Sequence, residues 1–279
     1  MIERDWMTQL RTTHIVQPIQ NDPRTKPAGS LFGWSMNDAY KTGIEYGQAN
    51  FDAPVGNLQP CDRALLYAYL NQNRHLDELT HALTAMTSGD LVPLRQATVI
   101  DVGCGPFTGG LAMGLVLNGM FPFRYVGIDR ARSMQHLGHV LADAAMAAGG
   151  LEGGTTIEFH DSLDLYQRLG PPRGTWTIVL VCYLLASPTI DVVAMANSIV
   201  AACDRNGPGQ VSVLCLNSAA AMANSRFPDF SARMATLGFE PRVEDSELFT
   251  DTRSKHKDVH YALFHRPEKL AVSVPGVDQ

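Results

Sequence analysis

An apolar run that stops at a cluster of glycines is the feature that most limits how this chain can fold. Residues 99–110 read VIDVGCGPFTGG, so a β-rich run ends at Asp101 and is followed by Gly103, Gly105 and two further glycines. Where a strand turns into a helix at glycines, backbone N–H groups at the helix start lack partners, and the positive end of the helix dipole lies beside them. The pattern predicts a turn that binds the polar or anionic part of a ligand.

Apolar, β-rich runs alternate with helical stretches after residue 97. The runs are apolar enough to be covered on both faces, which is typical of a parallel sheet with helices on both sides. The expected strands are 97–102, 123–129, 155–160, 175–183 and 210–217, and the expected helices are 108–120, 131–148, 163–169, 188–204 and 226–237. Residues 240–267 then predict two strands joined by a polar loop. We expect an α/β fold with a doubly wound, mostly parallel seven-stranded sheet that ends in an antiparallel hairpin.

The sequence before residue 97 does not show this alternation of strands and helices. Residues 17–35 read QPIQNDPRTKPAGSLFGWS, and their prolines and glycines predict an irregular, extended arm. From Met36 to about Gly89 the periodicity is helical, with Asp62 as the expected N-cap of DRALLYAYLNQ. We therefore predict an N-terminal arm and helical cap over 1–94, a ligand-binding domain over 95–267 and a flexible tail over 268–279.

Composition narrows the class of protein. The 22 Lys and Arg against 28 Asp and Glu give a net charge of −6, which argues against a surface that grips nucleic acid throughout. The five cysteines include no CxxC pair, so we expect neither a disulfide scaffold nor a metal site. The N-terminus is charged where a signal peptide is apolar, and no apolar run approaches the ~20 residues that span a bilayer. These features predict a soluble, cytoplasmic protein that does not bind membranes.

Two ligand classes fit the glycine turn poorly. A phosphate-binding P-loop needs GxxxxGK(S/T), and no lysine follows these glycines. The dinucleotide fingerprint GxGxxG matches Gly103 and Gly105, but Thr108 stands where its third glycine belongs. The chain also has no YxxxK pair for a hydride-transfer site.

A third class fits better, because VIDVGCGP resembles the first motif of the class I S-adenosylmethionine (SAM)-dependent methyltransferases. In that family an acidic residue stands two positions before a GxG pair, after the first strand. A third glycine usually follows where this chain has Phe107. The resemblance covers about 95–266 and implies SAM as cofactor and S-adenosylhomocysteine as product. It places Asp101 on the cofactor ammonium and the backbone of Gly103, Cys104 and Gly105 against its methionine and ribose.

Two later carboxylates extend the resemblance. In FRYVGIDRA the second expected strand ends at Asp129, where a carboxylate accepts the ribose hydroxyls. In TIEFHDSLD the third expected strand ends at Asp161-Ser162, where the family contacts adenine. We expect the carboxylates of Asp101, Asp129 and Asp161 to converge on one cofactor. Each residue also has a structural interpretation, since Asp129 and Asp161 could cap the helices that follow and the glycines could serve a tight turn alone. The remaining cofactor contacts that we predict are Arg130, Cys182 and Tyr46, of which the last two also suit packing.

The methyl acceptor should lie beyond the fourth strand, at VLVCYLLASP. This stretch lacks the (D/N/S)PP(Y/F/W) tetrad of amino-methylating DNA enzymes, which disfavours that reaction. Tyr183 is the candidate catalytic residue, and a core aromatic or a wall against the adenosine is its alternative. The cap aromatics Trp34, Tyr40, Tyr46 and Phe51 suit an apolar or planar acceptor, although they equally suit packing of the cap. Lys41 and His14 are possible bases without supporting geometry.

Three functions follow from these residues. The first is transfer of a methyl group from SAM to an O or N atom of a small molecule held between the cap and the end of the fourth strand. The second is RNA methylation, in which a basic loop would contact phosphate, unless that loop is simply solvated. The third is a SAM-binding module that acts through a protein partner without turnover. The basic loop consists of Arg253, Lys255, His256, Lys257 and His260.

Overall fold

A seven-stranded sheet with the order β5-β4-β3-β6-β7-β9-β8 forms the centre of the computed structural model. The structure describes residues 4–26, 29–87, 91–167, 176–187, 189–249 and 257–269. The parallel strands are β3 (Thr98–Val102), β4 (Arg124–Ile128), β5 (Thr156–His160), β6 (Trp176–Cys182) and β7 (Gln210–Ser218). The predicted hairpin is confirmed as β8 (Glu240–Phe249) and β9 (Lys257–Arg266). Its second strand, β9, is the antiparallel one and lies between β7 and β8, so the antiparallel strand is not at the sheet edge.

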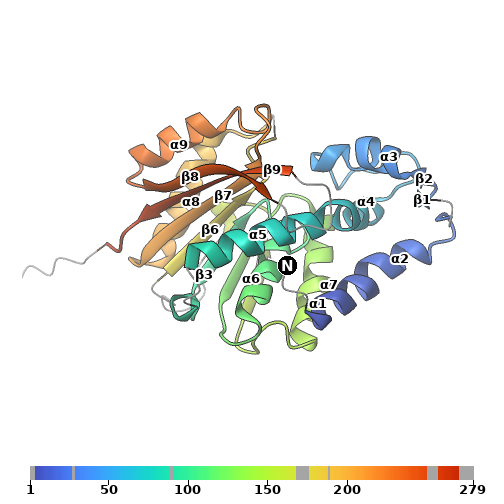
Figure 1. Cartoon of the computed structure of the whole chain (residues 1–279), viewed down its shortest axis with the longest axis horizontal. Coiled ribbons are helices and arrows are strands. Elements are labelled where there is room, and N and C mark those ends of the chain that lie inside the picture. The colour runs from blue at the N-terminus through green and yellow to red at the C-terminus, as the bar shows by residue number, and fades with distance from the viewer. Residues whose placement is uncertain are drawn as a thin grey trace, which may run out of the picture.

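Helices cover both faces of the sheet (Figure 1). On one face lie α6 (Thr108–Leu117) and α7 (Arg132–Ala147), and on the other lie α8 (Val192–Asn206) and α9 (Phe227–Thr236). Adjacent residues of one strand point to opposite faces, and Val99 and Ile100 of β3 accordingly belong to different apolar clusters. This double coverage is why the strands read as continuous apolar runs.

Two predicted connections differ from the structure. The helix predicted over 163–169 is a single 3₁₀ turn, Leu163–Leu165, whose segment continues into the fully buried Tyr166. The helix predicted from residue 188 begins at Val192, because Asp191 caps it by accepting from the N–H groups of Val193 and Ala194.

The N-terminal region is more helical than predicted. Helix α1 (Asp5–Arg11), a π-helical turn (Thr12–Val16) and α2 (Gln17–Gln20) follow one another without a break, so the irregular arm begins only after Gln20. Pro18 is tolerated because it lies in the first turn of α2, directly after a π-helical turn that already interrupts the regular hydrogen bonding.

Short elements connect this helix to the long cap helix. They are β1 (Ser30–Leu31), β2 (Trp34–Ser35), α3 (Met36–Asp38), a π-helical turn (Ala39–Gly43) and a 3₁₀ turn (Glu45–Gly47). The long helix comprises α4 (Pro60–Tyr67), a π-helical turn (Ala68–Gln72) and α5 (Asn73–Thr87), and the 3₁₀ turn Val92–Leu94 leads on to β3.

The long cap helix begins one turn earlier than predicted. Its N-cap is Gln59, and Asp62 stands three positions further on, where its carboxylate accepts the Gln59 N–H at 2.9 Å.

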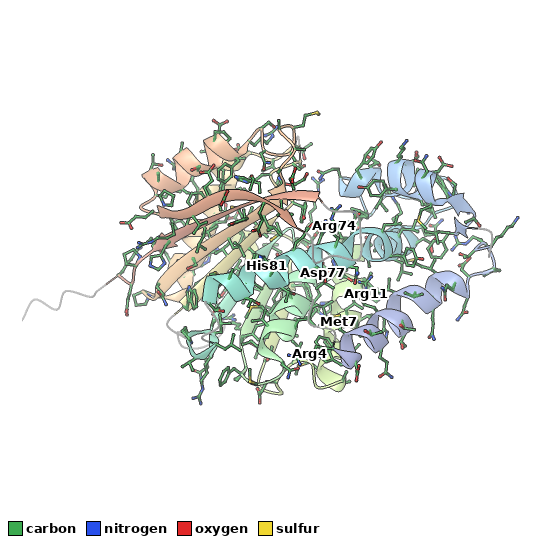
Figure 2. All side chains as sticks on the ribbon, in the orientation of Figure 1. Arg4, Met7, Arg11, Arg74, Asp77 and His81 are labelled. Atoms are coloured by element: carbon green, nitrogen blue, oxygen red, sulfur yellow. The ribbon has the colours of Figure 1, made fainter. Side chains whose placement is uncertain are left out.

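The cap helix is joined to the glycine turn by a buried glutamine. Gln72 is fully buried, and its amide donates to the Pro106 carbonyl at 2.9 Å while its carbonyl accepts from Arg11 at 2.8 Å. Arg11 projects from α1 towards α5, which carries Asp77 (Figure 2). Burial lowers the pKa of Arg11 to about 10, and the Asp77 carboxylate opposes this shift. Helices α1 and α5 are therefore held on the same turn that follows β3.

Candidate active site

A cavity of about 720 Å³ opens at the carboxyl ends of β3, β4, β6 and β7, beneath the cap. This volume is typical of small-molecule sites, and the edge of the sheet is where open α/β folds bind their ligands. The sheet side contributes Gly103, Gly105, Asp129, Arg130, Cys182 and Tyr183. The cap side contributes Tyr46, Phe51, Tyr67, Arg74, His75 and Glu78.

Backbone hydrogen bonds hold the glycine turn on the end of the neighbouring strand, β4. The N–H groups of Gly103 and Cys104 both donate to the Ile128 carbonyl, at 2.8 and 3.1 Å. Gly103 has φ +74°, and a Cβ there would lie 3.0 Å from the Leu184 side chain, so glycine is required. The unpaired N–H groups predicted at this turn are thus engaged within the protein, and the turn presents backbone atoms as a fixed wall of the cavity.

Asp129 is the one of the three predicted carboxylates that lines the cavity. Its two oxygens accept from the N–H groups of Gly105 and Ala131, each at 2.9 Å. Burial raises the pKa of Asp129, while these two N–H groups and Arg130 act in the opposite direction. Each carboxylate oxygen has a further lone pair, so Asp129 can accept two more hydrogen bonds from a ligand. Its partners hold it against the glycine turn in one orientation.

Asp101 lies beneath the turn and outside the cavity lining. It is 3% exposed, and one oxygen accepts from the Tyr125 hydroxyl at 2.8 Å and from the Gly109 N–H at 3.2 Å. Burial raises its pKa to about 7. Asp101 therefore anchors the start of α6, and its role toward the cofactor ammonium, directly or through water, stays a prediction.

Asp161 and Ser162 also lie outside the cavity lining. The Asp161 side chain is 48% exposed and accepts from Gln135 at 2.9 Å, on the surface beyond β5. Of the three predicted carboxylates, Asp129 lines the cavity, Asp101 is buried beneath the turn and Asp161 is exposed at the end of β5. The Gln135 amide that donates to Asp161 also donates to the Asp129 carbonyl, so Asp161 stays next to the strand end that carries Asp129. Convergence of all three carboxylates on one cofactor stays a prediction.

Phe107 stands where the family usually has a third glycine, and the fold accommodates its ring in the core. It adopts φ +65°, a left-handed conformation, and its fully buried ring packs edge-on against Tyr125 at 4.7 Å. Gly110 makes room for that ring, since a Cβ there would lie within 2.0 Å of it. The phenylalanine and the glycine that follows it are thus a matched pair.

The thiols near the turn are buried. Burial raises the pKa of Cys104 and of Cys182 well above the ordinary value, so both stay protonated near neutral pH. Cys182 lines the cavity, whereas Cys104 is 2% exposed and does not. Neither thiol is suited to act as a nucleophile.

The cap segment 43–53 is held over the cavity by Arg63. This arginine is 2% exposed, and it donates to the carbonyls of Gly43, Asn50 and Ala53 at 2.7, 2.7 and 2.6 Å. The segment includes Tyr46, which lines the cavity with φ +59° and is 58% exposed. Arg63 thereby fixes a wall whose backbone would otherwise relax.

The far end of this segment is tied to α7. The Asp52 carboxylate accepts from the N–H groups of Arg132 and Ser133, both at 2.9 Å, and the Ser133 hydroxyl donates to the Phe51 carbonyl. Helix α7 has Ala131 at its own N-cap position, which offers no side-chain acceptor. Asp52, distant in sequence, serves as the cap in its place and joins the cap segment to the turn that carries Asp129.

A polar group on α5 completes the cavity and was not predicted. Arg74, His75 and Glu78 line it together with Tyr67 and the predicted Tyr183. The stretch NRHLDELTHAL has the apolar period of an ordinary amphipathic helix. The sequence feature that could have indicated these cavity residues is the three-residue spacing of His75 and Glu78, which places both on one side of a helix.

The basic loop lies largely outside the described residues. This holds for Arg253, Lys255 and His256, and the side chain of Lys257 is likewise not described. His260 lies in β9, where its ring packs against Phe227 at 4.6 Å and its side chain is 12% exposed. It is therefore a packing residue of the sheet.

The described residues contain no group of three or more His, Cys, Asp and Glu side chains arranged to hold a metal ion. None of the helices described is long and apolar enough to cross a membrane.

The strand order, the inserted antiparallel β9 and the glycine turn after β3 together give the class I methyltransferase fold that the sequence motif implies. No known family profile matches the sequence, and no curated protein matches it significantly.

Several solved methyltransferase structures are similar to this chain. One is a candidate RNA methyltransferase from Pyrococcus horikoshii, with a TM-score of 0.43 and 10% identity over 69% of this chain and 83% of that one. Another is magnesium protoporphyrin IX methyltransferase from Synechocystis with bound SAM, with a TM-score of 0.39 and 14% identity over 82% and 94%. A third is the N-methyltransferase NodS from Bradyrhizobium japonicum, with a TM-score of 0.41 and 15% identity over 71% and 100%. These values are too low to carry a functional assignment.

Proposed function

We propose that the protein is a SAM-dependent methyltransferase that methylates an O or N atom of a small molecule held between the helical cap and the end of β6. The observation that carries the proposal is Asp129, a buried carboxylate fixed by Gly105 and Ala131 at the wall of the cavity. Such a carboxylate suits the two ribose hydroxyls of an adenosine, and the glycine backbone beside it admits a close ligand. When bound, SAM supplies an electrophilic methyl group.

The other cavity residues have roles that follow from their positions. We assign Arg130 and Tyr46 to the cofactor side, because both lie near the turn or the cap segment that border Asp129. Asp101 supports the site from beneath through Gly109. Tyr183 and α5 line the part of the cavity that we assign to the acceptor. A cytoplasmic location belongs to the same proposal, and it rests on the five free cysteines.

Isothermal titration with SAM and S-adenosylhomocysteine tests the cofactor site. Asp129→Ala should weaken binding by about 10- to 100-fold, because hydrogen bonds to a charged group contribute about 1.5–3 kcal/mol. Asp143→Ala removes an exposed carboxylate of α7 that lies outside the cavity lining, and it should change the affinity by less than about 3-fold. Full affinity in Asp129→Ala would refute the site.

Turnover is tested with SAM labelled in its methyl group. The protein is incubated with separate small-molecule, RNA and protein fractions of a cell extract, and the label and released S-adenosylhomocysteine are measured in each. We expect label in the small-molecule fraction. Label in RNA alone would favour the RNA enzyme, and cofactor binding without release of product from any fraction would favour a binding module.

A further inference from the structure

Tyr183 is held at the end of β6 in an unusual conformation. Its φ is +58°, which costs free energy for a residue with a Cβ, and its N–H donates to the Leu216 carbonyl at 2.7 Å. The ring reaches from the sheet towards the cap, where it stacks on the His75 imidazole with centroids 3.8 Å apart and planes 16° apart. This backbone geometry places a phenol in the cavity between sheet and cap.

The Tyr183 hydroxyl donates to the carboxylate of Glu78 on α5. Glu78 is 3% exposed and lines the cavity behind that phenol. Arg74, one turn earlier on α5, lies 3.5 Å from the other Glu78 oxygen and keeps a positive charge beside it. Glu78 is thus a buried carboxylate held between a phenol hydroxyl and a guanidinium, where water reaches it only with difficulty.

His75 is not free to act as the base. Its Nε2 lies 2.9 Å from an Arg74 nitrogen, and because a guanidinium only donates, Nε2 must be the acceptor. The ring proton is then on Nδ1, which faces the Tyr67 hydroxyl at 3.4 Å. Arg74 thereby assigns one neutral tautomer to His75, and Glu78 is the remaining base of this group.

We propose that Tyr183 and Glu78 form a proton relay that deprotonates the methyl acceptor, a suggestion that rests on the proposed function. The acceptor donates its O–H or N–H proton to the Tyr183 oxygen as the Tyr183 proton passes to Glu78. The pair freed on oxygen, or the lone pair that an amine nitrogen already carries and whose N–H proton leaves as the bond forms, makes the new bond to carbon, and the pair of the breaking carbon–sulfur bond remains on sulfur. Glu78 ends protonated, so one positive charge and one carboxylate charge are removed together. Tyr183 is the catalytic residue, and Glu78 acts through it.

The relay and its surroundings define the class of acceptor. Three rings follow one another along the cavity wall, with Tyr183 stacked on His75 and Tyr67 edge-on to His75, and aromatic walls suit a planar molecule. A relay that ends on a buried carboxylate is useful only to an acceptor that must lose a proton. The acceptor class is therefore a small planar compound with a hydroxyl or amino group, such as a phenol or an aromatic amine.

Binding of model acceptors tests this subsite without turnover. Phenol and aniline are compared with fluorobenzene, which has a similar shape but no proton to donate, by ligand-observed NMR with the protein saturated in S-adenosylhomocysteine. We expect phenol and aniline to bind at least about 5-fold more tightly than fluorobenzene, as one net hydrogen bond of about 1 kcal/mol implies. Tyr183→Phe should abolish this preference, whereas Glu78→Gln, whose amide oxygen still accepts from the Tyr183 hydroxyl, should retain most of it. Equal binding of all three probes to the wild type, or no binding of phenol and aniline, would overturn the proposal.

Methyl transfer to phenol and aniline tests the relay itself. Glu78→Gln should lower kcat by about 100-fold or more with KM changed far less, since general-base catalysis contributes 10²–10⁴. In Glu78→Ala, added formate should restore at least about one tenth of the lost rate, which a purely structural role would not allow. Wild-type kcat in Glu78→Gln would refute the relay.

Two matched variants control for general effects. Tyr69→Phe removes a phenol hydroxyl outside the cavity lining, and Glu247→Gln neutralises a half-exposed carboxylate of β8, so both should behave as wild type. Titration with SAM separates the two proposals. If the wild type does not bind SAM, the proposed function is refuted. If it binds SAM but binds phenol, aniline and fluorobenzene equally well, only the relay is refuted.

Discussion

Asp101 gives the protein a stability that falls as the pH rises from acid to neutral. Burial raises its pKa from 3.8 to about 7, so between these values the folded protein retains a proton that the unfolded chain has lost. The free energy of unfolding must then fall as pH rises through this interval, and it levels off above the folded pKa. The largest loss from this one group is about 4 kcal/mol.

Urea unfolding of the wild type and of Asp101→Asn between about pH 5 and about pH 8 measures this effect. The amide keeps an acceptor for Tyr125 or Gly109 but cannot ionise, so the wild type should lose stability relative to the variant as pH rises. Asp129, whose pKa is also raised, is present in both proteins and cancels in the comparison. A constant difference between the two proteins across this range would contradict the assignment.

Which residues line the cavity could be predicted where the course of the backbone alone determines their position. Gly103, Gly105, Asp129 and Tyr183 line the cavity because the ends of parallel strands must meet at one edge of the sheet. The orientation of Asp101 could not be predicted, since it depends on the Tyr125 hydroxyl from the adjacent strand.

The contribution of α5 to the cavity could not be predicted either, because it depends on how this helix packs against the rest of the molecule. Glu78 and His75 occupy polar positions of an amphipathic helix, which a sequence pattern assigns to solvent. They are buried because α5 packs on α6 on one side and closes the cavity on another. Only the tertiary arrangement turns those positions inward.

Among the elements, the strands were the most predictable. Each of the five parallel strands lies within one or two residues of its predicted bounds, since a strand covered on both faces must be apolar throughout. Helix starts were less predictable, because capping partners come from elsewhere. Asp52 caps α7 from a segment far away in the sequence, and nothing local to Ala131 signals it.

The capping of α7 by Asp52 can be tested by mutation. Asp52→Ala leaves two N–H groups of α7 without an acceptor and should lower the free energy of unfolding by about 1 kcal/mol. It should also weaken SAM binding, because Arg132 and Ser133 directly follow the turn that positions Asp129. Urea titration and calorimetry measure the two effects.

Asp52→Asn is the matched variant, because an asparagine oxygen caps about as well as that of aspartate. It should retain most of the stability and the affinity. If Asn and Ala variants lost both to the same extent, the negative charge rather than the capping bonds would be the important property of Asp52.

On the scale of the whole molecule, the predicted division near residue 94 does not divide the apolar core. Met7, Leu10 and Ile19 of the N-terminal helix belong to the same buried cluster as Val99 of β3 and Leu111 of α6. Trp6 packs directly on the backbone of Gly150, where a Cβ would lie 2.6 Å from the indole. A cap that shares its core with the sheet is expected to unfold together with it.

The three tryptophans allow this to be measured, because Trp6 and Trp34 lie in the cap and Trp176 lies in β6. In Trp176→Phe the fluorescence reports the cap, and in the double variant Trp6→Phe/Trp34→Phe it reports the sheet. Within each variant, the urea midpoint from fluorescence should coincide with the midpoint from far-ultraviolet circular dichroism, which follows all helices and strands. If the cap fluorescence changed at a lower urea concentration than the circular dichroism, the cap would be a separately unfolding lid. The cavity walls would then assemble only when it closes, whereas a single transition means that Asp129, Tyr183 and Glu78 stand in place before any ligand arrives.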